Sequence, residues 1–197
     1  MINTLSKDPI MKNLIDEFGI LSLDSNYMKS SGNLLYDLSS YIIRQQLSNK
    51  VADKIWQKFV QLFENDITCN KILATTDIDF KEIGISTNKI KYLKSLAQNV
   101  QDKTVELDKL ESLSDEEAVM QLTKIKGIGQ WTAEMFLMFS LHRADVFAFG
   151  DLGLNKALQN LYGNGELLSI EQQLEITSKW SPFKSYASLY LWKSLEQ

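Results

Sequence analysis

The sequence predicts an all-α protein, and three observations support this prediction. Apolar residues recur at the helical spacing of about 3.6 residues in nearly every segment. Two prolines and nine glycines in 197 residues leave few helix breaks. Only residues 145–149 resemble an extended strand, and one short isolated strand cannot form a sheet.

The first predicted helices lie before residue 64. Asp8 is a favourable N-cap and Pro9 suits the first helical position, so a helix begins there. Three apolar stripes at helical spacing follow: Ile10, Leu14 and Phe18; Leu34, Leu38, Tyr41 and Ile42 within residues 34–46; and Val51, Ile55, Phe59, Leu62 and Phe63.

The later helices are predicted from caps as well as from apolar stripes. Three residue pairs resemble capping boxes: Asp79 with Glu82 before a short helix that ends at Gly84, Ser114 with Glu117, and Ser169 with Gln172. Two further stripes are Ile90, Leu93, Ala97 and Val100, and, after a helix start at Ser181-Pro182, Tyr186, Leu189, Tyr190 and Leu195. The sequence shows no internal repeat and no low-complexity linker, so we expect one shared core even if there are two lobes.

The composition excludes several kinds of protein. A hydrophobic fraction of 44% is normal for a globular protein and argues against disorder. The single cysteine, Cys69, excludes an internal disulfide and a four-cysteine zinc or iron–sulfur site, and the single histidine, His142, excludes a histidine cluster. The N-terminus lacks a signal peptide's apolar core, and no apolar run reaches the roughly 20 residues that span a bilayer. We therefore expect an intracellular protein without a membrane partner, either cytoplasmic and associated with the nucleoid or nuclear.

The net charge of −4 argues at first against a nucleic-acid partner. Basic residues, however, gather in residues 40–60 and 81–94, whereas acidic residues gather in residues 102–117 and 166–175. A basic face with an acidic back would be compatible with DNA contact, because a local face matters more than the total charge. The plain alternative is that these lysines are solvated helix faces.

A glycine-containing turn joins two predicted helices at residues 124–129. Gly127 and Gly129 permit a tight turn with positive φ and a close approach of another backbone. The peptide N–H groups after the turn are the unpaired donors of a helix N-terminus, which can bind a phosphate without a charged side chain. Taken alone, two close glycines more often mark only a turn between helices.

Asp151 stands where a later helix begins, between Gly150 and Leu152. Aspartate is a favoured N-cap, so the residue type alone predicts a cap. The intervening helix spans about 18 Å at about 1.5 Å per residue, which lets the acid return toward a DNA strand held by the glycine turn. A phosphate-binding turn joined to a positioned acid suggests chemistry on DNA rather than DNA binding alone, so Asp151 is also a candidate catalytic residue.

Four ordered blocks resemble the helix–hairpin–helix DNA glycosylase superfamily and, within it, the 3-methyladenine DNA glycosylase II family. The blocks lie within about residues 30–193 and are Arg44-Gln-Gln-Leu-Ser-Asn-Lys50, Ile83-Gly-Ile-Ser-Thr-Asn-Lys89, Ile125-Lys-Gly-Ile-Gly-Gln-Trp-Thr-Ala133, and Trp180-Ser-Pro-Phe-Lys-Ser-Tyr-Ala187 with Tyr190-Leu-Trp192. The resemblance implies a two-lobed all-α fold with the active-site cleft between the lobes. We expect one compact domain, residues 1–197, with lobe one near residues 45–145 and lobe two near residues 1–44 and 146–197.

The resemblance also implies a function. It is that of a monofunctional DNA glycosylase, which hydrolyses the N-glycosidic bond of alkylated purines, 3-methyladenine or 7-methylguanine in type, in double-stranded DNA and so initiates base excision repair. Asp151 matches the family's catalytic aspartate, whereas Asp145 resembles an acid with a structural capping or pairing role. Trp131 stands where lyases of the superfamily carry a lysine nucleophile, so no imine intermediate is expected. Ala148 replaces a usual proline, which would loosen the loop entering Asp151. We expect no cofactor and a monomer.

Further residues are expected to contact DNA or the flipped base. Trp131 and Trp180 match family positions that line the base pocket, and Tyr41 is a further candidate, whereas Phe147, Trp56 and Trp192 are expected in the core. Gln46 or Leu47 would fill the space that the flipped base leaves; the plain alternative is a helix terminus capped by Ser48. The phosphate-binding hairpin is expected to comprise Thr123, Ile125, Gly127, Ile128, Gly129 and Thr132. No metal is required, although the carbonyls of Thr123, Ile125 and Ile128 would suit a sodium or potassium ion that bridges to the phosphate.

Three other functions stay open. A non-catalytic helix–hairpin–helix DNA-binding module would give Asp151 no special role and would leave the aromatic pocket residues unexplained. A glycosylase for oxidised or mismatched bases would more naturally keep a lysine near residue 131 or a more polar pocket. A helical protein-interaction domain would fit the acidic net charge but not the hairpin.

Overall fold

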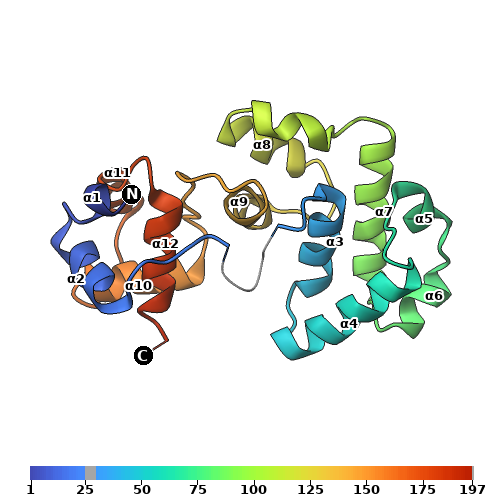
Figure 1. Ribbon diagram of the computed structural model, residues 1–197, viewed down its shortest axis with the longest axis horizontal. Helices are drawn as coiled ribbons and strands as arrows, with labels where there is room; N and C mark the ends of the chain where they lie inside the picture. Colours follow the sequence, from blue (N-terminus) through green and yellow to red (C-terminus); the bar gives the residue numbers. More distant parts are fainter. Residues whose placement is uncertain (25–29, 197) are drawn as a thin grey trace. The chain divides into compact units, whose positions relative to one another are not determined.

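The computed structural model describes residues 1–24 and 30–196, and within these ranges it contains helices, turns and loops but no strand (Figure 1). The predicted all-α class is therefore confirmed. Residues 145–149, which resemble a strand in the sequence, form part of a loop and a turn.

Contacts between residues divide the chain into two compact units. Unit 1 comprises Met1–Lys29 and Leu137–Gln197, and unit 2 comprises Ser30–Phe136. These boundaries differ from the expected lobes, because residues 34–44 form a helix that packs within unit 2 rather than joining the first helices. The second boundary falls inside a helix, after Phe136, and not in the loop that follows it.

Unit 1 is built around its last helix, α12 (Lys184–Lys193), which packs against α10 (Leu152–Leu161) and α2 (Pro9–Phe18). Trp180 and Tyr190 are its largest fully buried side chains. The unit also contains α1 (Ile2–Leu5), α11 (Ile170–Ser178) and the end of α9 (Gln130–Phe139).

Unit 2 is built around α7 (Thr87–Gln101), which packs against three other helices (Figure 1). These are α3 (Leu34–Arg44), α5 (Cys69–Ala74) and α6 (Asp77–Glu82). The unit also contains α4 (Asn49–Leu62), the 3-10 helix η1 (Leu107–Ser112), α8 (Asp115–Leu122) and the first part of α9. Trp56, Phe59, Phe63 and Phe80 form an aromatic cluster in its core.

Local capping signals in the sequence predict several helix starts correctly. The Asp8 carboxylate accepts hydrogen bonds from the backbone N–H groups of Ile10 and Met11, and Pro9 is the first residue of α2. The capping boxes of Ser114 with Glu117 and of Ser169 with Gln172 are both present. These helix starts depend on residues three positions apart, so local sequence specifies them.

Other helix boundaries were predicted wrongly. The capping box of α6 is Thr76 with Asp79, three residues before the expected pair, although Gly84 does follow the helix with a φ of 96°. The last helix begins at Lys184 and not at Ser181-Pro182. The helix expected over residues 34–46 ends at Arg44, and α1, α5 and η1 had no apolar stripe that predicted them.

Candidate active site and DNA-contacting loops

Asp151 is the N-cap of α10, and the residue is 8% exposed. The carboxylate oxygen Oδ1 accepts a hydrogen bond from the Leu154 backbone N–H at 2.8 Å and from the Trp192 indole Nε1–H at 3.0 Å. The first bond is the cap that the sequence predicts, and the second comes from a helix 41 positions further along the chain. Two donors to one oxygen fix the orientation of the carboxylate.

Trp192 is the partner of Asp151 that sequence reasoning missed, because we expected it only in the core. Its side chain is half-buried and lies 6.1 Å from the Phe139 ring. Gly153 makes room for the contact: a Cβ there would lie 3.1 Å from both Asp151 Oδ1 and Trp192 Cδ1. A glycine two residues after a candidate acid, inside a helix, was the available signal for a close approach.

The loop that enters Asp151 is held by hydrogen bonds on both sides. The Asp151 backbone N–H donates to the Ala148 carbonyl at 2.9 Å, and the Asn155 side-chain amide donates to the Phe149 carbonyl at 2.8 Å. Ala148 itself is fully buried. The loosening expected from the missing proline is therefore not seen.

Asp145 has the structural role expected of it. Its carboxylate accepts from the Ser181 hydroxyl at 2.6 Å and from the Lys184 backbone N–H at 3.2 Å, and it pairs with the Lys184 ammonium at 3.2 Å. These bonds tie the start of α12 to the loop that leads to Asp151. Ser185 adds a second tie, since its hydroxyl accepts from the Val146 N–H at 3.0 Å.

The structure does not support the assignment of Trp180 to the base pocket. Trp180 exposes no surface and its indole Nε1–H donates to the Asp8 carboxylate at 3.0 Å. Tyr162 donates to the same carboxylate oxygen at 2.8 Å, and burial beside this charge raises the pKa of the Tyr162 hydroxyl. The sequence block was recognised correctly, but Trp180 lies in the core of unit 1 and anchors α2.

The glycine turn of the hairpin packs tightly against α7. Gly127 has a φ of 93°, and a Cβ at this position would lie 2.2 Å from Tyr92 Cγ. Gly127 is thus required for its conformation and for the ring that covers it. Gly129 does not have a positive φ, and a Cβ there would meet no atom within 4 Å, so the positive φ and close approach that both glycines permit occur at Gly127 and not at Gly129.

Most side chains predicted to form the hairpin are buried, whereas Lys124 and Lys126 in the same turn are exposed. Ile125, Ile128 and Thr132 are buried, and Thr123 is exposed with its hydroxyl bonded to the Val119 carbonyl at 2.9 Å. The Ile128 N–H donates to the Ile125 carbonyl at 3.0 Å, which leaves that carbonyl a second lone pair. Helix α9 begins directly after the hairpin, so the first N–H groups of a helix lie at this turn.

Trp131 and Tyr41 differ in exposure. Trp131, in the first turn of α9, is 41% exposed, whereas Tyr41 is buried and its hydroxyl donates to the Met135 carbonyl at 3.2 Å. A flipped base can stack only on an accessible ring. Trp131 therefore has the geometry of a stacking residue, and the assignment of Tyr41 to the pocket stays a prediction.

The turn between α3 and α4 carries the two wedge candidates. Gln46 is exposed and has a φ of 56°, unusual for a residue with a side chain, and Leu47 is half-buried. Ser48 occupies the N-cap position of α4, but its side chain makes no capping hydrogen bond. The plain alternative is therefore met only in part, because Ser48 has the cap position without a capping hydrogen bond.

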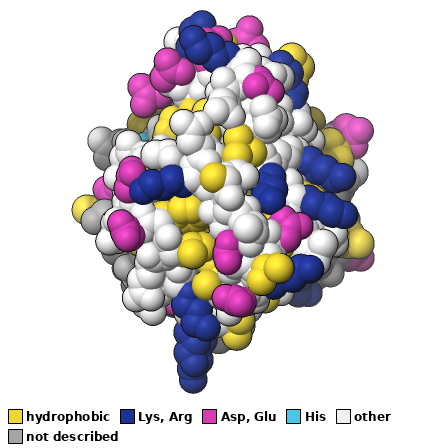
Figure 2. All heavy atoms as spheres, turned by 90° about the vertical axis from the view of Figure 1, so that its right-hand side faces the viewer, with side chains coloured by type: hydrophobic (Ala, Val, Ile, Leu, Met, Phe, Trp, Pro, Cys, Tyr) yellow, Lys and Arg dark blue, Asp and Glu magenta, His cyan; other side chains and the backbone are white. Residues whose placement is uncertain are grey.

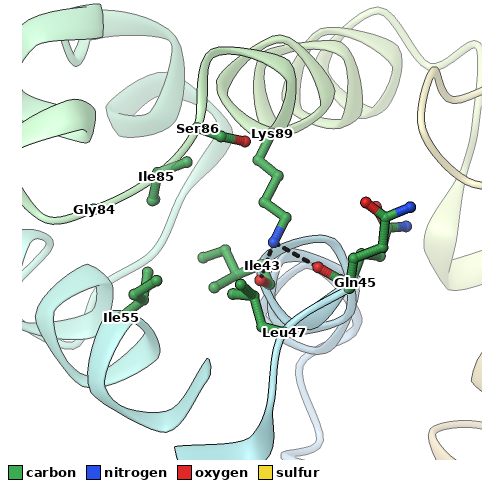
Figure 3. Close-up of a pocket in the computed structure, with 9 residues that line it drawn as sticks. Ile43, Gln45, Leu47, Ile55, Gly84, Ile85, Ser86 and Lys89 are labelled. Atoms are coloured by element: carbon green, nitrogen blue, oxygen red, sulfur yellow. Dashed lines mark hydrogen bonds between the residues drawn. The ribbon is translucent and has the colours of Figure 1, made fainter. Parts of the chain in front are cut away.

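The Lys89 side chain extends from α7 to this turn (Figure 3). Its ammonium donates to the Ile43 carbonyl at 2.8 Å and to the Gln45 carbonyl at 2.7 Å. A hollow of about 210 Å³ lies beside it, lined by residues of the turn, by Ile55 and by residues 84–86. Burial lowers the pKa of Lys89 from its ordinary value. From the sequence, this lysine was placed in a basic segment and at the end of the Ile83–Lys89 block, but it was assigned no role.

On the face drawn in Figure 2, Lys and Arg side chains are interspersed with Asp and Glu side chains, so this face has no uniform charge. Several cations are paired, for example Arg44 with Asp53 at 2.7 Å and Lys94 with Asp77 at 2.6 Å. The face drawn therefore offers no uniform basic patch for phosphate contact.

The described residues contain neither a cluster that could hold a metal ion nor a helix that could span a membrane. Residues 1–24 and 30–196 contain no group of three or more His, Cys, Asp or Glu side chains placed to hold a metal ion. Over the same ranges, no helix combines the length and the apolar character needed to cross a membrane.

The chain is similar in sequence to known DNA repair proteins. Residues 39–182 match the family described as HhH-GPD superfamily base excision DNA repair protein. DNA-3-methyladenine glycosylase 1 of Schizosaccharomyces pombe is 34% identical over 80% of this chain and 71% of its own length.

Two solved structures are also similar. The structure of S. pombe 3-methyladenine DNA glycosylase in complex with abasic DNA has a TM-score of 0.85 and 30% identity, covering 100% of this chain and 96% of that one. DNA-3-methyladenine glycosidase of Bacillus halodurans has a TM-score of 0.84 and 34% identity, covering 97% of this chain and 86% of that one. The chain therefore belongs to the HhH-GPD superfamily of base excision DNA repair proteins.

Proposed function

We propose that this protein is a monofunctional DNA glycosylase that releases alkylated purines, of the 3-methyladenine or 7-methylguanine type, from double-stranded DNA. One observation carries the proposal: the Asp151 carboxylate, at a helix N-terminus, is fixed by the Leu154 N–H and the Trp192 indole. The 3-methyladenine activity named for the S. pombe and B. halodurans relatives supports the substrate class.

Asp151 has the charge that this reaction needs. The bond between C1′ of the sugar and the base nitrogen breaks, its electron pair leaves with the base, and positive charge develops on the sugar. A carboxylate beside the sugar stabilises that charge, and a water oxygen then adds to C1′ with loss of a proton. An alkylated purine with a formal positive charge is already a good leaving group, so the reaction needs no strong general acid.

The other proposed roles belong to DNA binding. The backbone at Thr123–Gly129 and the N-terminus of α9 bind a phosphate. The carbonyls of Thr123, Ile125 and Ile128 would hold a sodium or potassium ion, which would supply positive charge for the phosphate. The exposed ring of Trp131 stacks on the flipped base. Gln46 or Leu47 fills the vacated stack. The protein acts as a monomer, in the nucleoid of a bacterium or the nucleus of a eukaryotic cell.

The test is base release from duplex DNA that has been methylated in vitro. We expect free 3-methyladenine or 7-methylguanine in the supernatant and intact abasic strands, with no covalent protein–DNA adduct after borohydride treatment. An adduct would indicate an imine-forming lyase and would contradict the proposal. No release from the methylated duplex, with binding retained, would instead favour a non-catalytic DNA-binding module.

A further inference from the structure

We infer that one face of α7, carrying Lys89, Tyr92 and Ser95, positions the wedge turn and the phosphate-binding hairpin together, so that Lys89 is a positioning residue for the distortion of duplex DNA. The wedge turn is defined here as residues 45–47. The three α7 residues are spaced three apart and therefore share one side of the helix. The inference rests on the proposed function of both loops.

The Lys89 ammonium holds the wedge turn by hydrogen bonds to backbone carbonyls. The last carbonyls of a helix lack partners within that helix, and Lys89 donates to two carbonyls at the end of α3, those of Ile43 and Gln45. Both bonds have lengths of 2.8 Å or less, which is typical of charge-assisted hydrogen bonds. Figure 3 shows the lysine side chain extending from α7 to both oxygens.

Tyr92 and Ser95 hold the hairpin. The Tyr92 ring covers Gly127 so closely that no Cβ fits between them. The Ser95 hydroxyl accepts a hydrogen bond from the Lys126 backbone N–H at 3.1 Å. The ring and the hydroxyl thus fix the hairpin on the same helix that holds the wedge turn.

A direct bond closes this arrangement. The Gln45 side-chain amide donates to the Gly127 carbonyl at 2.8 Å, joining the wedge turn to the hairpin. Gln46, next in the chain, has a positive φ of 56°, which a residue with a side chain keeps only where its surroundings hold it. Since bases and phosphates of a duplex have fixed spacings, a wedge can enter the stack only if its distance from the phosphate grip is also fixed.

The test compares Lys89→Met, which keeps the aliphatic stem and removes the amine, with Lys109→Met. Lys109 also lies in unit 2, its side chain is 62% exposed, and its replacement changes the net charge equally. The probe is a duplex with an abasic-site analogue and 2-aminopurine in the opposite strand, whose fluorescence rises when the stack is disrupted. We expect the fluorescence rise at saturating protein to be lost in Lys89→Met and kept in Lys109→Met.

A second readout separates positioning from a general loss of fold. The rate of base release from methylated duplex DNA should fall about tenfold in Lys89→Met, while the rate with methylated single-stranded DNA stays unchanged, because only a duplex needs the wedge. Equal losses with both substrates would overturn the inference. Lys89→Arg keeps a cationic donor, and the neighbouring hollow leaves room for its larger head group, so it should restore the duplex rate.

The fluorescence readout does not depend on hydrolysis. If the unmodified protein releases no base but raises the fluorescence, the proposed function fails and the inference is still decided by Lys89→Met. A fluorescence rise in folded Lys89→Met equal to that of the unmodified protein would overturn it. No fluorescence rise with the unmodified protein would overturn it as well, since no wedge would then act.

Discussion

The Asp151 carboxylate is held differently from the two loops of unit 2 that are proposed to contact DNA, the hairpin and the wedge turn. Asp151 is oriented by a cap to Leu154, three residues away, with one added bond from Trp192. The hairpin and the wedge turn depend on α7, whose contacts reach across 31 to 46 positions of the chain. The proposed catalytic group is thus fixed at one helix end, whereas the loops proposed to contact DNA are fixed by tertiary packing. Mutations in the two regions should therefore separate reaction rate from DNA binding.

The largest predicted loss of stability is at the hairpin. Gly127→Ala forces a Cβ into the Tyr92 ring and into a positive φ, so we expect the free energy of unfolding to fall by about 3 kcal/mol. Gly129→Ala is the matched control, because a Cβ there meets nothing within 4 Å. Denaturant unfolding measures both variants, and equal stabilities would show that the Tyr92 contact does not hold the hairpin.

Trp180→Phe tests whether this residue belongs to the core or to a pocket. The change removes the donor to Asp8 and part of a fully buried ring, so we expect a loss of about 2 kcal/mol in unfolding free energy. The rate of base release per folded molecule should stay the same. An unchanged midpoint of unfolding with a selective loss of rate would restore Trp180 to the base pocket.

Trp192→Phe tests the long-range hydrogen bond from the indole to the Asp151 carboxylate. It keeps an aromatic ring beside Phe139 but removes the Nε1–H that donates to Asp151. With the carboxylate less well oriented, we expect kcat to fall about tenfold while KM stays nearly unchanged. Steady-state kinetics on methylated duplex DNA measures this, and a change confined to KM would mean that Trp192 acts on substrate binding instead.

Trp131→Leu should have the smallest effect on the fold. The ring is 41% exposed, so we expect a stability loss below about 1 kcal/mol. Loss of stacking on the flipped base should lower kcat/KM about fivefold, and more for a cationic alkylated base than for a neutral one. Rates with the two kinds of base in the same duplex context give the comparison, and equal losses would argue against cation–π contact.

Local patterns predicted much of this structure. Asp8, Ser114 and Ser169 cap helices as expected, because a cap needs only residues two or three positions apart. The N-cap position of Asp151 was predictable for the same reason. The glycine hairpin was recognised by the resemblance of its block to the family, because two close glycines alone favour only a turn.

Long-range packing explains what the sequence did not reveal. The bond from Trp192 to Asp151 spans 41 positions, and the glycine two residues after Asp151, which leaves room for the contact, does not by itself identify the partner. Trp180 could be a pocket wall or a core residue by type, and only its burial against Asp8 decides between them. By residue type Lys89 could be a solvated lysine, and only the fold brings the end of α3 within hydrogen-bond distance of its ammonium.

The most direct test of the central claim is the single-turnover rate of base release by Asp151→Asn, measured at saturating methylated duplex. Asparagine is as good an N-cap as aspartate and its Oδ1 can accept the same two hydrogen bonds, so the variant removes the charge and keeps both bonds. We expect the rate to fall at least about 100-fold, with unchanged affinity for duplex DNA that carries an abasic-site analogue. A rate within about twofold of the unmodified protein would contradict a catalytic role for the Asp151 charge.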